Sequence, residues 1–231
     1  MLNSVISVVI PAFNEEKTIG NVIEETIRTM ESLRMPYEII VVDDGSTDRT
    51  KEIATRYKVN VLSNGRNHGK GYALRKGFTY AQGDIIVTID ADGAHNPKEI
   101  PDLINPLFNG VDIVAGSRFL GRERNHTSKL HMLGNHMINV IVMILTGKRI
   151  TDSQTGLRAF KREFLKKIGL ESQGYEIETE ITVKGLKNGF NFQEIPISCK
   201  RRKYSISKLK ILSDGLKIFK TIFKSAVKNN Y

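Results

Sequence analysis

The sequence predicts an α/β protein with a mostly parallel sheet that helices cover on both faces. Over the first half of the chain, short apolar segments rich in Val and Ile alternate with longer segments of helical periodicity. The short segments are apolar throughout, which is typical of parallel strands buried on both faces. The 231 residues suffice for one domain with a substantial core, and the single cysteine, Cys199, excludes an intramolecular disulfide.

Five strands and four helices are expected to alternate in this half of the chain. The first helix is predicted by apolar residues at spacings of three and four, from Ile19 to Met30. The Ser-Thr-Asp sequence at 46–48 is typical of an N-cap, and Pro97 suits the first turn of a helix. The expected strands are 4–10, 38–42, 59–62, 84–89 and 111–115, and the expected helices are 15–33, 46–57, 69–81 and 97–108.

The pattern changes after the fifth strand. A polar, basic stretch leads into an expected helix at 129–146, and the last helix, at 207–228, is amphipathic and basic. We expect a main domain at 1–200, which includes 129–146 as an interfacial helix, and a basic amphipathic segment at 201–231. The remaining expected elements are helices near 161–168 and 176–188 and a strand at 190–197.

The formal net charge of +10 is concentrated near the C-terminus. Between Pro196 and Tyr231 there are ten Lys or Arg residues and one acid, Asp214, so the rest of the chain is nearly neutral. A basic tail on a neutral body indicates an anionic partner. Nucleic acid, acidic lipid and a phosphorylated substrate would each fit.

The last helix suits the surface of a membrane, because lysines flank an apolar stripe. No segment reaches the roughly 18–20 apolar residues of a membrane span, and no signal peptide is evident. We therefore expect a peripheral protein at the cytoplasmic face of a membrane, without a transmembrane helix. An ordinary helix packed on the core, with its lysines in water, is the alternative. The stripe consists of Leu209, Leu212, Leu216, Phe219 and Phe223.

Polar residues gather where the expected strands end, and Asp90 and Asp92 are the centre of this group. Ligands of open parallel sheets bind outside the carboxyl ends of the strands. Carboxylates at i and i+2 of an extended segment point to the same side and repel unless a positive charge lies between them. A Mg²⁺ or Mn²⁺ ion that also binds phosphate would supply that charge. The structural alternative is an Asp-Gly turn.

Other functional classes have little support. The glycines at 65–71 lack the GKS or GKT ending of a phosphate loop and the spacing of a dinucleotide fingerprint. The five histidines show no zinc spacing. No nucleic-acid-binding motif is present and there is no Trp for stacking, so we expect no nucleic-acid partner. A basic nucleic-acid-binding protein is retained only as a third hypothesis.

Seven motifs together resemble family 2 glycosyltransferases, and within them the polyprenol-phosphate sugar synthases. The resemblance covers nearly the whole chain, and the set is far more specific than any single motif. The motifs are VVIPAFNEE at 8–16, VVDDGSTD at 41–48, GKGYALRKGF at 69–78, DADGAHNP at 90–97, GSRF at 116–119, TDSQTGLRAF at 151–160 and SCKRRKYSISK at 198–208.

The resemblance implies a Rossmann-like GT-A fold and a metal-dependent sugar transfer. The donor would be a nucleotide-diphosphate sugar (GDP-mannose, UDP-glucose or UDP-GlcNAc), the acceptor a polyprenyl or dolichyl phosphate, and the metal Mg²⁺ or Mn²⁺ at Asp90 and Asp92. Asp92, Arg118 and Arg202 would be catalytic. The nucleotide-sugar site would comprise Pro11, Phe13, Glu15, Asp43, Asp44, Asp90, Ala91, Asp92 and Arg118, and the acceptor phosphate would meet Arg202, Lys208 and Lys129.

Some positions depart from the family pattern. Ala94 stands where Gln is frequent, which implies one more water on the metal, and Phe13 replaces a frequent Tyr. Lys129 and His131 stand where an arginine near the acceptor is expected. These departures concern the sugar and the acceptor contacts more than the reaction class.

The acceptor class decides whether a general base is needed. A phosphate monoester has a second pKa of about 6 and is already largely dianionic at neutral pH, so it requires cations rather than a base. A hydroxyl acceptor in a glycan is the alternative; it would require a base, and Glu178 and Glu180 are the candidates. In both cases positive charge must stabilise the departing diphosphate.

Overall fold

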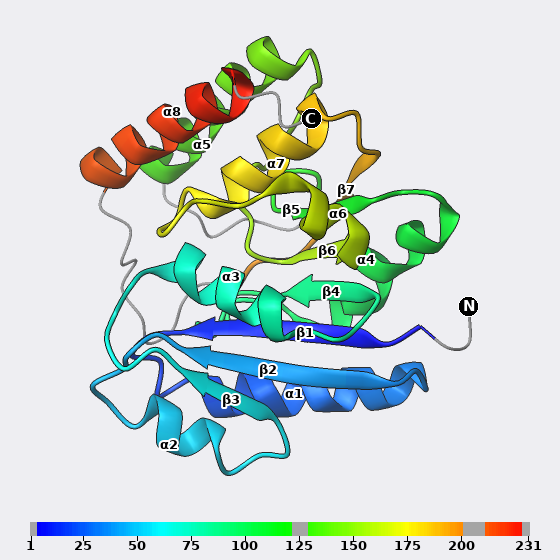
Figure 1. The fold of residues 1–231 in the computed structure, drawn as a ribbon, viewed down its shortest axis with the longest axis vertical. Helices are drawn as coiled ribbons and strands as arrows, with labels where there is room; N and C mark the ends of the chain where they lie inside the picture. The colour runs from blue at the N-terminus through cyan, green and yellow to red at the C-terminus, as the bar shows by residue number, and fades with distance from the viewer. Residues whose placement is uncertain (1–3, 122–128, 201–210, 228–231) are drawn as a thin grey trace.

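The chain folds around a seven-stranded sheet in the order β3-β2-β1-β4-β6-β5-β7 (Figure 1). The computed structural model describes residues 4–121, 129–200 and 211–227. The strands are β1 Ile6–Ala12, β2 Tyr37–Asp43, β3 Asn60–Ser63, β4 Ile85–Thr88, β5 Ile113–Ser117, β6 Arg158–Lys161 and β7 Phe192–Pro196.

Within the described sheet, β6 runs against the other strands. β1 pairs in parallel with β2 and β4, β2 with β3, and β5 with β7, whereas β6 is antiparallel to both β4 and β5. The predicted mostly parallel sheet is therefore confirmed. β6 was not predicted, because its four residues include two charged side chains and carry no strand pattern of their own.

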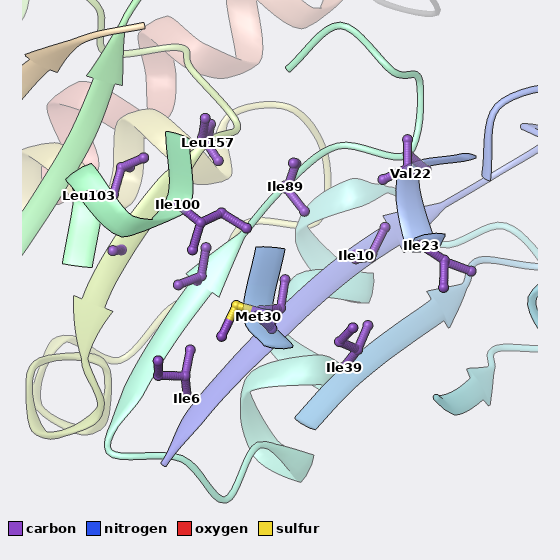
Figure 2. Packing of buried hydrophobic residues seen from close by; sticks show 14 of the residues in the cluster. Ile6, Ile10, Val22, Ile23, Met30, Ile39, Ile89, Ile100, Leu103 and Leu157 are labelled. Atoms are coloured by element: carbon purple, nitrogen blue, oxygen red, sulfur yellow. The ribbon is translucent and has the colours of Figure 1, made fainter. Parts of the chain in front are cut away.

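Helices cover both faces of the sheet. α1 (Ile19–Leu33) lies behind the sheet in Figure 1, and α3 (Lys70–Tyr80) lies in front of it. Figure 2 shows Val22, Ile23 and Met30 of α1 packed over Ile10 and Ile39 of the strands, all of them buried. The opposite face is covered by α3, by α6 (Arg162–Ile168) and by α7 (Ile177–Lys187).

Two predicted helices are shorter or more broken than expected. The helix expected at 46–57 is α2, Thr50–Ala54, because Ser46 and Asp48 instead accept hydrogen bonds from the loop after β1. The helix expected at 97–108 is divided into η1 (Pro97–Glu99), α4 (Ile100–Ile104) and η2 (Asn105–Asn109). Pro101 and Pro106 lack the N–H that a continuous helix requires.

The two remaining helices form a layer of their own against α7. They are α5 (Lys129–Thr146), with the predicted bounds, and α8 (Ile211–Val227). A separate small cluster holds this layer together, and it includes Val142, Val183, Ile218 and Ile222. Among the residues that the structure describes, no helix has the length and apolar composition to cross a membrane.

Gly77→Ala should destabilise the fold by overpacking. A Cβ at Gly77 would lie 2.4 Å from Val9 Cγ1. Overpacking costs about 1–3 kcal/mol, which exceeds the gain of about 1 kcal/mol from replacing a helical Gly with Ala. Denaturant unfolding should give a lower midpoint than wild type, whereas Gly134→Ala, where nothing lies within 4 Å, should not lower it. A midpoint at or above wild type for Gly77→Ala would contradict this packing.

Candidate functional site

The loops after β1, β2, β4 and β5 meet at one edge of the sheet. The first two are tied together, because the N–H of Asn14 donates to Ser46 Oγ at 3.0 Å. The loop after β4 meets the segment that precedes β6, where Gly156 lies against Asp90. The loop after β5 meets the same segment through an ion pair. The strand-end residues predicted from the sequence therefore share one edge.

Asp90 is held by a buried lysine that also binds Glu178. Lys70 Nζ lies 2.6 Å from Asp90 Oδ1 and 2.6 Å from Glu178 Oε1. Burial disfavours the charged form of Lys70, but the two carboxylates outweigh it and raise the pKa of Lys70 above its ordinary value. Burial raises the pKa of Glu178, although the ion pair with Lys70 opposes that shift. Lys70 was not among the site residues expected from the sequence. The Gly-Lys-Gly sequence at 69–71 was the feature that could have pointed to it.

The position of Asp90 depends on a glycine. A Cβ at Gly156 would lie 2.4 Å from Asp90 Oδ2, so no other residue fits there without moving the carboxylate. Asp92 Oδ1 accepts a hydrogen bond from the N–H of Ala94 at 2.9 Å. His95 is buried with its Nε2 3.8 Å from Asp90 Oδ2, beyond hydrogen-bond distance.

The carboxylates of this edge suit a divalent cation, because carboxylate oxygens are ligands that Mg²⁺ and Mn²⁺ prefer. Among the residues that the structure describes, electrostatic interactions connect five carboxylates with three cationic side chains. No cluster of three or more His, Cys, Asp or Glu residues with metal-ligand geometry occurs in the described residues. A cation here would therefore take further ligands from substrate and water, as Mg²⁺ commonly does. The carboxylates are Asp90, Asp92, Asp152, Glu178 and Glu194, and the cations are Lys70, Arg118 and Arg158.

Arg118 faces a carboxylate of its own chain. Its Nε donates to Asp152 Oδ2 at 2.7 Å, and its Nη2 donates to Asp152 Oδ1 at 2.9 Å. Asp152 is fully buried, and its own N–H donates to Glu194 Oε1 at 2.7 Å. Asp152 thus fixes the direction of the arginine at the edge of the site. Contact between Arg118 and phosphate stays a prediction.

Asp43 and Asp44 hold loops together at this edge, and their contact with a nucleotide stays a prediction. Asp44 accepts hydrogen bonds from the N–H groups of His68 and Gly69 and from the side chain of Asn64. Asp43 accepts from the N–H of Ser46 and, more weakly, from Ser63 Oγ. Both carboxylates are buried, so their first role is to shape the loops around the site.

The remaining predicted residues are placed unevenly. Pro11 and Ala91 are buried at the edge of the sheet where the site lies. Phe13 and Glu15 are half-buried in the loop after β1, where the N–H of Glu15 donates to Thr50 Oγ1 at 2.7 Å. Of the expected acceptor-phosphate residues, Arg202 and Lys208 lie outside the described residues, and Lys129 is described only as the start of α5.

The structure separates the two candidate bases. Glu178 faces Lys70 and Asp90, whereas Glu180 binds Lys184 Nζ at 2.6 Å and accepts from the N–H of Ser172 at 2.8 Å. Glu180 lines a polar pocket of about 510 Å³ between α7, α8 and the loops at 67–69 and 171–174. That pocket contains neither Asp90 nor Asp92. Only Glu178 of this pair is therefore near the carboxylate cluster.

The chain matches the model of the family described as Glycosyl transferase family 2 over residues 7–169. The chain belongs to this family. The GT-A architecture and the glycosyltransferase class predicted from the motifs are thereby confirmed. Solved structures show the same fold. Glucosyl-3-phosphoglycerate synthase from Mycobacterium tuberculosis, in complex with Mn²⁺, UDP and phosphoglyceric acid, has a TM-score of 0.80 to this chain. The two are 23% identical, and the match covers 98% of this chain and 80% of that one.

Relatives of this family 2 glycosyltransferase include proteins of similar length. An uncharacterized protein of Methanocaldococcus jannaschii is 40% identical over 228 residues, covering 95% of this chain and 91% of that one. The UDP-N-acetylglucosamine–dolichyl-phosphate N-acetylglucosaminyltransferase of Methanococcus voltae is 34% identical and covers 95% of both. Other relatives are longer: the chain spans 50% of the undecaprenyl-phosphate 4-deoxy-4-formamido-L-arabinose transferase of Pectobacterium carotovorum, at 36% identity over 167 residues.

Gly156→Ala should impair the site more than the fold. The added methyl group must move the Asp90 carboxylate out of the position from which it would bind a metal ion. We therefore expect Mn²⁺ binding and sugar transfer to fall at least roughly tenfold, since misplacing reacting groups by about 1 Å costs up to about 100-fold. Mn²⁺ binding and unfolding midpoint should be measured on the same preparation. Gly134→Ala, where nothing lies within 4 Å and φ is not positive, reports the cost of a methyl group at a glycine away from the site. Wild-type Mn²⁺ affinity in Gly156→Ala would contradict the role of this glycine.

Proposed function

We propose that this enzyme transfers a sugar from a nucleotide diphosphate to a polyprenyl phosphate at a membrane surface. The observation that carries the proposal is the carboxylate cluster at Asp90, whose oxygens suit a divalent cation. The motifs and the printed activities of relatives support the donor and acceptor classes: the enzyme of Methanococcus voltae is named for UDP-N-acetylglucosamine and dolichyl phosphate, and a relative in Pyrococcus furiosus is named dolichol-phosphate mannosyltransferase.

We assign the divalent cation, Mg²⁺ or Mn²⁺, to Asp90 and Asp92. When bound, such an ion stabilises the negative charge of the departing diphosphate. Lys70 and Arg118 contribute positive charge at the same edge, and Arg118 is held there by the buried Asp152. A cation fixed in this way needs little reorganisation as charge develops, which is usually the largest source of electrostatic catalysis.

The acceptor assignment rests on the positive charge of the sequence that follows β7 and on the surroundings of Glu178. A phosphate monoester needs cations that bring it to the anionic donor, and the basic residues at 200–203, 208 and 210 supply them. Arg202 and Lys208 keep the acceptor role proposed from the sequence. A hydroxyl acceptor would need Glu178 as base. Glu178 is already held by Lys70 and faces the metal carboxylates, which favours a supporting role for it.

The outer helices support contact with a membrane. α8 has two apolar sides: Ile218 and Ile222 are buried against the protein, whereas Leu216, Phe219 and Phe223 remain 64%, 47% and 43% exposed. Exposed lysines occupy a third side of the helix, at 217, 220 and 224. α5 adds further exposed apolar residues, which are Met132, Leu133, Met137, Met143 and Ile144. A helix pair with an exposed apolar surface beside lysines suits the headgroup layer of an anionic membrane.

The position at the cytoplasmic face is part of the same proposal. It follows from the proposed donor, because nucleotide sugars are made in the cytoplasm. The acceptor supplies the membrane, since a polyprenyl phosphate stays in the bilayer by its lipid chain.

The reaction class is tested by measuring which acceptor receives the sugar. Purified enzyme should transfer sugar from one member of a panel of UDP- and GDP-sugars to polyprenyl phosphate, with the product detected by mass spectrometry. Excess chelator and Asp92→Ala should each remove most activity. Polyprenol, which offers a hydroxyl in place of the phosphate, should not accept sugar.

A second arm separates the two acceptor mechanisms. Glu180→Gln, away from the carboxylate cluster, should report only the cost of disturbing α7. Glu178→Gln should stay within roughly tenfold of that control, since losing a true general base costs about 10²–10⁴. Transfer to polyprenol, together with collapse of Glu178→Gln alone, would overturn the phosphate acceptor in favour of a hydroxyl.

Membrane binding should depend on the exposed side of α8. Replacing Leu216, Phe219 and Phe223 with Ser leaves the buried side intact, unlike deletion of the helix. Full burial of one such side chain is worth roughly 1.5–3 kcal/mol, so flotation with anionic liposomes should show at least tenfold weaker binding. Tyr80→Ser removes an exposed aromatic residue elsewhere and serves as the matched control. Equal liposome binding by the triple variant and wild type would show that this surface does not meet lipid.

A further inference from the structure

Lys70 already occupies a cation position beside the carboxylate that we assign to the metal. Its ammonium lies between Asp90 and Glu178, 2.6 Å from an oxygen of each. The side chains of Lys70, Asp90 and Glu178 are 14%, 18% and 4% exposed, so water screens this triad little. Asp90 cannot retreat, because Gly156 lies directly against its other oxygen.

The backbone around Lys70 is built to place this side chain. Lys70 is the first residue of α3 and stands between Gly69 and Gly71. A Cβ at Gly69 would lie 2.4 Å from the carbonyl oxygen of Gln173, and a Cβ at Gly71 would lie 2.6 Å from that of Ser172. The two glycines therefore let the start of α3 approach the loop that leads into α7. This close approach brings the ammonium of Lys70 into contact with the carboxylate of Glu178.

A divalent cation and the ammonium of Lys70 compete for the same carboxylate. Like charges repel strongly in a partly buried site, and Asp90 cannot neutralise both ions. A lysine ammonium is a compact point charge on a flexible stem, so it can leave one oxygen and bind another without moving the backbone. The donor diphosphate would offer such oxygens at the moment when the metal needs Asp90.

We propose that Lys70 is a placeholder cation, which holds Asp90 in the donor-free enzyme and releases it to the metal when a nucleotide diphosphate arrives. The inference rests on the metal site of the proposed function and not on the identity of the acceptor. It makes metal and nucleotide binding cooperative, because each ligand removes an obstacle to the other, and such coupling is reciprocal. A fixed structural ion pair would instead leave the metal affinity equally weakened with and without nucleotide.

The test measures Mn²⁺ affinity of the full chain by electron paramagnetic resonance, alone and with UDP or GDP. Lys70→Gln should bind Mn²⁺ at least roughly tenfold more tightly than wild type without nucleotide, because Asp90 is no longer neutralised. With the nucleotide that binds, the two proteins should differ less. The nucleotide should therefore strengthen Mn²⁺ binding by a smaller factor in Lys70→Gln than in wild type. Lys70→Arg, which keeps the charge, should retain weak donor-free binding.

Lys167→Gln is the matched control, since Lys167 is exposed on α6 and its loss changes the net charge equally. Unchanged or weaker donor-free Mn²⁺ binding in folded Lys70→Gln would overturn the inference. If that variant does not fold, Glu178→Gln replaces it: Lys70 would then rest on Asp90 alone, and Mn²⁺ binding should weaken more without nucleotide than with it. Equal weakening in both states would overturn the inference. Absence of Mn²⁺ binding by wild type with either nucleotide would instead refute the metal site itself.

Discussion

The structure depends on how one group of carboxylates is kept together at the edge of the sheet. Asp90 and Glu178 share Lys70, and Asp152 binds the fork of Arg118. Bringing carboxylates together without water is costly unless each has a positive partner or hydrogen-bond donors. Arg158 supplies further positive charge from within the core, where it interacts electrostatically with Glu178 and Asp152. Hydrogen bonds to the carbonyls of Ser153 and Thr155 hold it in place. The elements around the site are arranged to deliver these partners.

The antiparallel strand β6 explains how the partners arrive. A parallel strand brings its carboxyl end to the site, but β6 runs the other way and brings its beginning. The residues just before it, including Asp152 and Gly156, therefore reach the same edge as Asp90 and Arg118. Thr88 closes the contact, because its hydroxyl donates to the carbonyl of Gly156 at 2.8 Å. A parallel strand at this position would have placed these residues at the opposite edge.

The sequence predicted those features that depend on local pattern. The buried parallel strands are apolar throughout, and Asp90 and Asp92 stand at the end of one of them, so their shared location followed from the fold class. Lys70, Asp152 and Gly156 could not be assigned in the same way. Their partners lie far along the chain, and nothing in the spacing of a lysine between two glycines says which carboxylate it will meet. Long-range contacts decided these roles, as they decided the short strand β6.

α8 shows why a pattern can leave two alternatives open, because the helix has one buried and one exposed apolar side. An apolar stripe flanked by lysines fits a helix on a membrane and a helix on a core, and the membrane was favoured because the expected acceptor is a lipid. In the structure Ile218 and Ile222 face the protein, and Leu216, Phe219 and Phe223 do not. At about 100° per residue these two groups occupy different sides of the helix. The buried side packs α8 against α7, the helix whose Glu178 binds Lys70 in the carboxylate cluster. This packing fixes the direction in which the exposed apolar side faces.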